Sequence, residues 1–322
     1  MYKYDFTVIV VTYNAMWEKV KLTLDSIIRQ SFDNFEIIVA DDGSAKDVFE
    51  EIESFFKYNE FTRYTFVKNE KNQGTVNNLL SGLNQAQGKY IRMFGPGDLF
   101  YDENSLADVY KFMVESGCEG CFGRMRGYYK NEDGKYVTRP YTFPFDLRCY
   151  QRNDDDMITK NLVVFADNAS GASMCLTHEF MDEYLNKIAG KVVYLEDVFQ
   201  VMAALDGRRL QFYDDYLILY EDNVGISRNK KTGFHQLLRK DNDTFYELLF
   251  ELYSDNKYVK KRKALNNIYK IDNPYLRMIV SVVKNPGVVG WLFKHYIDVA
   301  FHKYDKPVRN NFLEEYDGNQ NV

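Results

Sequence analysis

Short apolar runs alternate with amphipathic segments over the first hundred residues of the chain. The apolar runs predict four strands, at Phe6–Thr12, Phe35–Ala40, Tyr64–Val67 and Lys89–Phe94. The amphipathic segments predict helices at Trp17–Gln30, at Ser44–Phe56 with Ser44 as the N-cap, and at Thr75–Ala86. Continuous apolar strands joined by helices are typical of a parallel sheet that is covered on both faces. We therefore expect an α/β fold with a mostly parallel sheet flanked by helices.

The pattern becomes less regular after this region and then helical. Strand-like segments follow at Gly120–Tyr129, Lys135–Arg139, Leu210–Tyr213 and Tyr216–Tyr220, with a loop at Asp167–Ser173 and a helix that starts near Glu196. Beyond Gly233 the pattern predicts helices at Phe234–Tyr253, Lys257–Tyr269, Pro274–Val283 and Gly287–Tyr304. We expect one domain over residues 1–227, with halves 1–105 and 106–227, and a C-terminal helical extension over 228–322.

Composition and charge exclude several classes of protein. Apolar residues make up 45% and charged residues 27% of the 322 residues, which is typical of a folded globular protein rather than a disordered one. The net charge of −6 argues against a nucleic-acid-binding protein, although Arg228–Arg309 holds 17 Lys and Arg against 8 Asp and Glu. The four cysteines are too few for a disulfide framework, and Cys118 and Cys121 are expected to be buried structural residues.

The N-terminus and the apolar segments indicate where in the cell the protein is expected. Met1–Asp5 runs into a strand without the apolar stretch of a signal peptide, so we expect a cytoplasmic protein. The most apolar late segment, Pro286–Phe301, is too short and too polar to span a bilayer. The basic C-terminal region (residues 233–304) is compatible with peripheral contact at the inner face of a membrane or with a homodimer interface, and both interpretations stay open.

Polar residues follow three of the predicted strands. Thr12-Tyr13-Asn14 comes after the first strand, Asp41-Asp42 after the second, and Gly95-Pro96-Gly97-Asp98 after the fourth. Ligands of open parallel sheets bind at the carboxyl ends of the strands, so these residues are expected to meet at one edge. Two adjacent carboxylates repel each other unless they accept hydrogen bonds or bind a cation, but they also suit a helix N-terminus. From Asp41-Asp42 alone both interpretations are open.

The order of these motifs is specific. The segments Phe6–Asn14, Leu24–Ser44, Asn72–Gly74, Gly88–Ile91 and Gly97-Asp98 together resemble the family 2 glycosyltransferases of the polysaccharide-biosynthesis type, which have the GT-A fold. The similarity covers residues 1–105, resumes at Tyr194–Val198 and continues loosely to Tyr220 and to Gly225–Ser227. The resemblance implies a Rossmann-type sheet whose first half binds a nucleotide sugar and whose second half binds the acceptor.

The resemblance also implies the donor site. The nucleotide sugar, most often a UDP-sugar in this family, would be bound by Thr12, Tyr13, Asn14, Asp41, Asp42, Asn72 and Gly74. Tyr13 would stack on or flank the base, and Asp42, with Asp41 beside it, would accept hydrogen bonds from the uracil edge. An aromatic face and a carboxylate acceptor are the groups that a uracil ring requires.

The expected metal site departs from the family pattern. Relatives place an Asp-x-Asp or similar cluster where this chain has Gly95, Gly97 and Asp98, so Asp98 is the candidate ligand for Mg²⁺ or Mn²⁺. A turn role for Asp98 is the alternative. Many relatives also carry an Arg where this chain has Leu79. The charge of the diphosphate must then be compensated elsewhere, with Arg92, Arg124, Arg126 and the later loop as candidates.

The catalytic residues come from the second half of the predicted domain. The resemblance implies that Asp197 is the general base of an inverting transfer, that Glu196 orients it or binds the acceptor, and that Ser170, Gly171 and Ala172 shape the acceptor pocket. Acids at a helix start and an ordinary turn-rich loop are the alternative interpretations.

The expected function is glycosyl transfer from a nucleotide sugar to a hydroxyl of a glycan or a lipid-linked glycan, in the synthesis of a surface polysaccharide such as a capsule. Two alternatives stay open. A sugar-phosphate nucleotidyltransferase shares such a sheet but carries a Gly-rich basic loop after its first strand, where this chain has Thr12–Ala15. A non-catalytic module that binds a nucleotide sugar or carbohydrate is suggested by Gly95 and Gly97 in place of acids.

Overall fold

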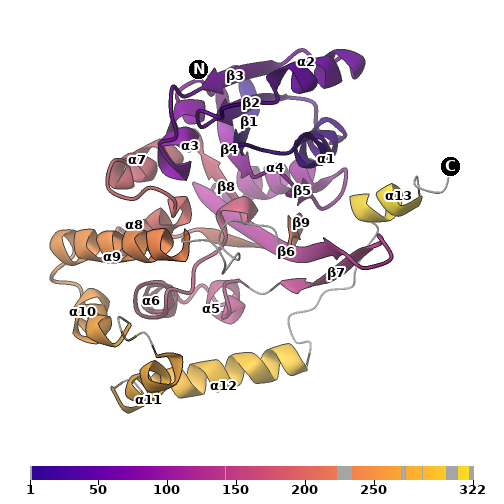
Figure 1. Cartoon of the computed structure of the whole chain (residues 1–322). Coiled ribbons are helices and arrows are strands. Elements are labelled where there is room, and N and C mark those ends of the chain that lie inside the picture. Colours follow the sequence, from indigo (N-terminus) through magenta and orange to yellow (C-terminus); the bar gives the residue numbers. More distant parts are fainter. Residues whose placement is uncertain are drawn as a thin grey trace.

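The computed structural model of the chain describes residues 2–141, 143–222, 234–269, 271, 273–284, 286–301 and 311–318. Among them, nine strands form one mixed sheet in the order β3-β2-β1-β4-β8-β6-β9-β5, with β7 paired to β6 (Figure 1). The strands are β1 (Tyr4–Thr12), β2 (Phe35–Asp41), β3 (Tyr64–Lys68), β4 (Gly88–Phe94), β5 (Leu99–Phe100), β6 (Gly120–Lys130), β7 (Tyr136–Tyr141), β8 (Met174–Thr177) and β9 (Gln211–Glu221).

Helices cover both faces and one end of the sheet. The α-helices are α1 (Trp17–Ile28), α2 (Phe49–Tyr58), α3 (Thr75–Leu83), α4 (Ser105–Ser116), α5 (Leu147–Gln151), α6 (Asp155–Lys160), α7 (His178–Ile188), α8 (Phe199–Leu205), α9 (Phe234–Leu252), α10 (Lys257–Tyr269), α11 (Pro274–Lys284), α12 (Gly287–Ala300) and α13 (Phe312–Gly318). Three short helices complete the described chain, η1 (Asn161–Phe165), η2 (Gly171–Ser173) and η3 (Glu196–Val198).

The first half is the predicted parallel α/β unit. β3, β2, β1 and β4 are parallel neighbours. Successive side chains of a strand point to opposite faces. Accordingly, Val8 and Val10 of β1 pack with the buried faces of α1 and α2, while Ile9 lies in the opposite core with α3. The fold class and the four strands of this half are therefore confirmed.

Two local predictions in this region are wrong. The second helix begins at Phe49 rather than at Ser44, because the Ser44 hydroxyl donates a hydrogen bond to the Asp41 carboxylate at 2.6 Å instead of capping a helix. The two strands predicted before Glu221 are one strand, β9, whose pairing with β6 shifts register near Arg124. At this irregularity the alternation of apolar and polar residues along β9 is interrupted, and the interruption is interpreted from the sequence as a gap between two strands.

The second half extends the sheet. β8 pairs antiparallel with both β4 and β6, and β6 in turn pairs parallel with β9. The short α13 returns to the far edge of the sheet, where Leu313 packs with Leu99 and Tyr101. The cysteines of the described chain are free thiols, and Cys121 is buried as expected, whereas Cys118 is half-buried.

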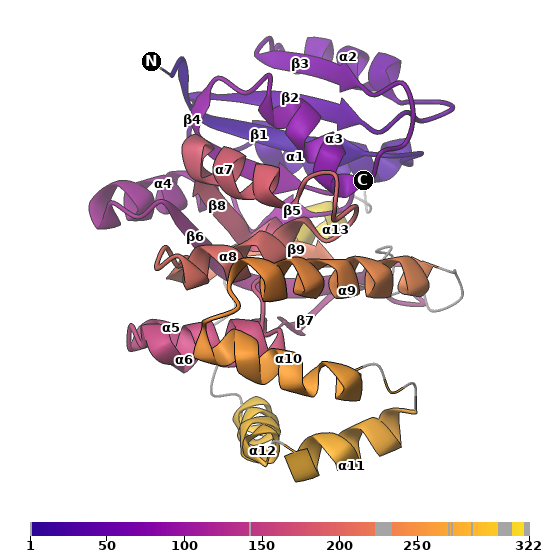
Figure 2. The ribbon, with the colours of Figure 1, turned by 90° about the vertical axis from the view of Figure 1, so that its left-hand side faces the viewer.

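The C-terminal helices confirm the helical pattern beyond residue 233. α9 packs into the same core as α3, α7 and α8, and α10 to α12 lie at the end of the molecule away from α2 and β3 (Figures 1 and 2). The predicted Gly225–Ser227 motif and the boundary at 227 lie outside the described residues. Within the described ranges, no helix has the length and apolar character needed to cross a membrane.

Candidate functional site

A cleft of about 510 Å³ lies at the carboxyl ends of β1, β2 and β4. It brings together the polar residues that follow these strands and the acids before α8. Twelve of the thirteen predicted site residues line it, namely Thr12, Tyr13, Asn14, Asp42, Asn72, Gly74, Asp98, Ser170, Gly171, Ala172, Glu196 and Asp197. Asp41 is the predicted site residue that is not part of the cleft lining.

Asp41 and Asp42 have different surroundings. Asp41 accepts hydrogen bonds from the Thr12 hydroxyl at 3.0 Å, the Ser44 amide at 2.8 Å and the Ser44 hydroxyl. The Ser44 hydroxyl in turn accepts from the Asn14 amide at 2.7 Å. Asp41 thus ties the loop after β1 to the loop after β2, and its carboxylate is used within the protein.

Asp42 accepts hydrogen bonds from the loop before α3. One of its oxygens accepts from Asn69 Nδ2 at 3.0 Å and from the Gln73 amide at 2.9 Å, and the other accepts from the Gly74 amide at 2.8 Å. A carboxylate offers about four acceptor positions. Because bonds from the described residues use three of them, one position is left among these residues for a ligand in the cleft.

The backbone conformation and the close packing at position 74 require a glycine. Its φ is +86°, and an added Cβ would lie 2.2 Å from Val193 Cγ1 and 2.6 Å from the Val193 carbonyl oxygen. The same carbonyl accepts from the Val76 amide at 3.0 Å. The loop that contributes Asn72 and Gly74 therefore packs directly on the segment that leads to Glu196 and Asp197.

A second group of charges surrounds Asp98. Burial raises the pKa of Asp98 to about 7, although the amides of Gly95 and Glu221 donate to its carboxylate. The side chain of Glu221 lies beside it, and an added Cβ at Gly97 would come within 2.3 Å of Glu221 Oε2. The carboxylate of Glu221 therefore occupies the space that an acidic side chain at position 97 would require.

Lys19 completes this group. Its Nζ lies 2.7 Å from Glu221 Oε2, and both residues line the cleft. The candidates expected to compensate the diphosphate charge are placed elsewhere. Arg92 is buried and donates to the Ala172 and Met174 carbonyls, Arg124 pairs with Asp214, and Arg126 donates to Thr138. Lys19 is the basic residue that lines this cleft within the described part of the chain.

The residues near Asp98 suit a hard divalent cation. Mg²⁺ is commonly held by one or two carboxylates together with substrate phosphates, and Asp98 with Glu221 provides two carboxylates at one side of the cleft. No group of three or more His, Cys, Asp or Glu side chains able to hold a metal occurs in the described ranges. The donor set therefore fits a cation that also binds phosphate oxygens.

Glu196 and Asp197 form a pair of partly buried carboxylates in η3, directly before α8. Burial and the neighbouring charge of Asp197 raise the pKa of Glu196. Burial also raises the pKa of Asp197, which accepts a hydrogen bond from the Gly171 amide. A carboxylate whose pKa is raised toward neutrality is suited to accept a proton.

The loop that precedes β8 packs against the segment that carries Glu196 and Asp197. Gln200 of α8 exchanges hydrogen bonds with the amide and carbonyl of Ala169, at 3.0 and 2.9 Å, and also donates to the Asp197 carbonyl. An added Cβ at Gly171 would lie 2.7 Å from Glu196 Oε1. Gly171 therefore leaves room for Glu196 at the floor of the cleft.

Three contributors to the site were not predicted from the sequence, namely Lys19, Glu221 and Asp241. Asp241 of α9 is buried and accepts from the Val193 amide at 3.0 Å and from the Tyr194 amide at 2.5 Å. It holds the segment before Glu196 in place. Glu221 ends a strand at the same edge as Asp98, and this position was the available signal in the sequence.

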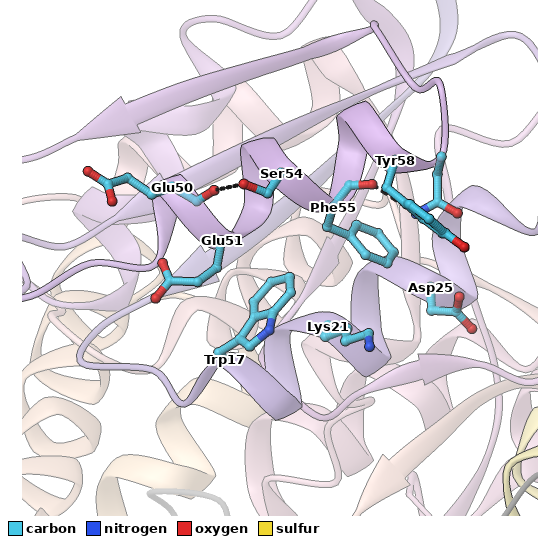
Figure 3. A pocket seen from close by; sticks show the side chains of 9 residues that line it. Trp17, Lys21, Asp25, Glu50, Glu51, Ser54, Phe55 and Tyr58 are labelled. Carbon is cyan, nitrogen blue, oxygen red and sulfur yellow. Dashed lines mark hydrogen bonds between the residues drawn. The ribbon is translucent and has the colours of Figure 1, made fainter.

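A second hollow lies elsewhere on the surface. It measures about 710 Å³ and runs between α1 and α2, where Trp17 and Phe55 meet edge to face with ring centroids 6.0 Å apart (Figure 3). Lys21, Asp25 and Glu51 flank these rings. This groove lies on the helices that cover the sheet, whereas the predicted site residues line the cleft at the strand ends.

Comparison with known proteins agrees with the geometry. Residues 7–175 match the profile of Glycosyl transferase family 2, which is more than half of the chain. A stretch of 131 residues is 34% identical to an uncharacterized glycosyltransferase of Rickettsia bellii and covers 41% of this chain and 18% of that protein. The chain thus spans less than a fifth of the length of this relative.

Two solved structures share the fold. The mannosyltransferase PcManGT from Pyrobaculum calidifontis, in complex with GDP-Man and Mn²⁺, is 16% identical with a TM-score of 0.54, covering 92% of this chain and 81% of its own. S. aureus TarS 1–349, in complex with UDP, is 18% identical with a TM-score of 0.50, covering 83% of this chain and 72% of its own. At these identities the likeness establishes the architecture alone.

Proposed function

The chain belongs to glycosyl transferase family 2, and on this basis we propose that it is an inverting glycosyltransferase that uses a UDP-sugar. The acceptor is a hydroxyl of a glycan or lipid-linked glycan in surface polysaccharide synthesis. One observation carries the proposal: Tyr13, Asp42, Asp98 and Asp197, distant in sequence, line a single cleft. The UDP and GDP-Man complexes of the two structural neighbours support a nucleotide-sugar donor.

The donor base fits the side of the cleft formed by β1 and β2. Tyr13 is 46% exposed and offers an aromatic face to a uracil ring. The free acceptor position of Asp42 can receive the uracil N–H, and the hydrogen bonds from Asn69, Gln73 and Gly74 hold the carboxylate in place. Asp41 supports this arrangement by fixing the loop that carries Tyr13.

The diphosphate fits the side formed by β4, α1 and β9. Asp98 and Glu221 would hold Mg²⁺ or Mn²⁺, which supplies positive charge to the leaving group when bound. Lys19 extends to the same place and offers an ammonium group to phosphate oxygens. The chain thereby offers the diphosphate two carboxylates and one amine, in place of the acidic cluster and the Arg of many relatives.

The acceptor side of the cleft contains the base. The acceptor hydroxyl oxygen forms a bond to the anomeric carbon, the bond from that carbon to the diphosphate oxygen breaks, and UDP leaves with the bonding electrons. Asp197 takes the hydroxyl proton, because a carboxylate with a raised pKa holds a proton more readily than an ordinary one. Glu196 is placed beside it to orient the acceptor.

A donor screen tests the proposal. UDP-sugars, GDP-sugars and dTDP-sugars are compared by the rise in Tm that each produces, with and without Mn²⁺. We expect UDP-sugars to raise the Tm of the wild type and to have less effect on Tyr13→Ala, whereas Tyr58→Ala, an exposed control on α2, behaves as the wild type. Equal stabilisation of Tyr13→Ala and the wild type would place the base elsewhere.

The cation site makes a separate prediction. Glu221→Gln and Asp98→Asn should each weaken Mn²⁺ binding in the presence of UDP by about tenfold or more, since even residues outside the coordination sphere cost 10- to 100-fold at metal sites. Mn²⁺ titration followed by electron paramagnetic resonance measures this affinity directly. Glu132→Gln, an exposed change in the β6–β7 turn, is the control. Unaltered Mn²⁺ affinity in both site variants contradicts the assignment.

The non-catalytic binding module is distinguished by turnover. Gly95 and Gly97 in place of acids are the observation that favours it, but Glu221 already fills the space beside Gly97. Release of UDP from a UDP-sugar in the presence of acceptor supports the enzyme. Binding without release of UDP for every donor and acceptor tried supports the module.

A further inference from the structure

The helices α11 and α12 carry large apolar side chains that the rest of the protein leaves exposed. Tyr275, Ile279 and Val283 of α11 are 75%, 56% and 73% exposed. Phe293 and Tyr296 of α12, with Phe301 just beyond it, are 67%, 68% and 72% exposed. We refer to these six side chains as the outer apolar face.

This face is distinct from the side by which the two helices are anchored. Val280 of α11 packs against the cluster of Val164, Leu265 and Ile268. Trp291 of α12 stacks on Phe165 with ring centroids 4.9 Å apart. The helices are therefore held on the domain through one set of apolar residues and present a second set outward.

Helix geometry explains how one segment serves both purposes. Residues advance by about 100° each, so Tyr275, Ile279 and Val283 fall on one side of α11. Trp291 and Phe293 are two residues apart, or about 200°, and lie on nearly opposite sides of α12. A surface helix of a water-soluble domain is normally polar on its outward side, so the outward apolar residues require another explanation.

The charge of this region indicates what covers the outer apolar face. The sequence from Lys257 to Phe301 holds nine Lys and Arg against two Asp and Glu, in a chain with a net charge of −6. Of these cations, Arg262 is buried, and Lys257 and Lys260 pair with Asp156 and Asp255. Lys261 and Lys284 are exposed. A second copy would bring the same basic surface against itself in a two-fold interface, and like charges would repel. An anionic bilayer attracts the charges and also accepts the apolar side chains.

We propose that α11 and α12 form a docking surface for an anionic lipid bilayer, into whose interface the outer apolar face inserts. Tyr275 and Tyr296 suit the headgroup region, where rings with one polar end are favoured, and Phe293 and Phe301 suit the boundary with the acyl chains. α11 and α12 lie together at one end of the molecule, so the domain would sit above the membrane with this end down (Figures 1 and 2). The inference is independent of the donor and of the reaction.

Vesicle sedimentation with the full chain tests the proposal. The wild type should bind vesicles of phosphatidylcholine mixed with phosphatidylglycerol, bind phosphatidylcholine alone more weakly, and lose affinity as salt rises. The triple variant Ile279→Ser, Val283→Ser, Phe293→Ser should lose at least about tenfold in affinity. Lys261→Glu with Lys284→Glu should weaken binding to the anionic vesicles alone.

The control is a matched triple variant at exposed apolar positions elsewhere. Tyr58, Val114 and Leu252 are 87%, 52% and 55% exposed, and their change to Ser should leave vesicle binding as in the wild type. The rise in Tm with a UDP-sugar, measured on the same samples, reports folding and the donor site separately.

Several results would overturn the proposal. They are no binding of the wild type to anionic vesicles, equal binding to both kinds of vesicle, and unchanged binding by the outer-face triple variant. A wild-type dimer in light scattering that the same variant converts to a monomer would also overturn it, because a second copy would then cover the face.

Discussion

Replacing Asp197 by Asn is expected to lower kcat by about 10²- to 10⁴-fold, the range for loss of a general base. The amide keeps the size of the side chain and can still accept from the Gly171 amide, but it cannot take the proton of the acceptor hydroxyl. The donor side of the cleft is unchanged, so UDP should bind with wild-type affinity. Turnover is followed as UDP release, and binding by calorimetry.

Asp133→Asn, at an exposed position in the β6–β7 turn, serves as the control and should retain full turnover. Near-normal kcat in Asp197→Asn would mean that another group takes the proton. A parallel loss of UDP affinity would mean that the substitution disturbs the whole cleft, and kcat would then carry no information about the base.

The pH dependence of kcat in the wild type follows from the protonation of Asp197. A base works when it is deprotonated, and burial raises the pKa of Asp197, so kcat should fall with decreasing pH through a pKa above the usual carboxyl range. Burial and the charge of Asp197 raise the pKa of Glu196 above that of Asp197, so Glu196 is protonated where Asp197 titrates. Glu196→Gln should therefore leave this acid limb in place. A limb that moves to lower pH would indicate that Glu196 is charged there and raises the pKa of Asp197.

The sequence was informative where a simple rule connects position and space. Carboxyl ends of neighbouring parallel strands meet at one edge, so residues that follow β1, β2 and β4 could be expected together before any coordinates. Tyr13, Asp42 and Asp98 do lie in one cleft. The acids before α8 could be placed there only through the family resemblance, because no local pattern connects residue 197 with residue 13.

Only the structure shows which of the two acids, Asp41 or Asp42, faces the cleft. Both acids follow a buried strand, and only the hydrogen bonds reveal that Asp41 is enclosed by Thr12 and Ser44 while Asp42 faces the cleft. Glu221 and Lys19 were missed for a related reason. Their pairing depends on the register of β9 against β6, which includes an irregularity that no alternation of residues predicts.

Gly74→Ala is expected to weaken UDP binding by at least tenfold, which corresponds to about 1.4 kcal/mol, and to lower the free energy of unfolding. The added methyl group would overlap Val193 Cγ1, at 2.2 Å, and the Val193 carbonyl, at 2.6 Å. To relieve the overlap, the loop before α3 must move away from the segment before Glu196. The Gly74 amide then loses its 2.8 Å hydrogen bond to Asp42, and the base pocket opens.

Gly190→Ala separates this overlap from the cost of the backbone conformation. Gly190 has a φ of +73°, close to the +86° of Gly74, but nothing lies within 4 Å of its added Cβ. Both variants should therefore lose about 1 kcal/mol from placing Ala in a left-handed conformation, and Gly74→Ala should lose about 1 to 3 kcal/mol more through overpacking. Urea unfolding measures both. Equal losses of stability with unchanged UDP affinity would show that the contact between Gly74 and Val193 does not hold the donor loop, and that the two halves of the cleft are positioned independently.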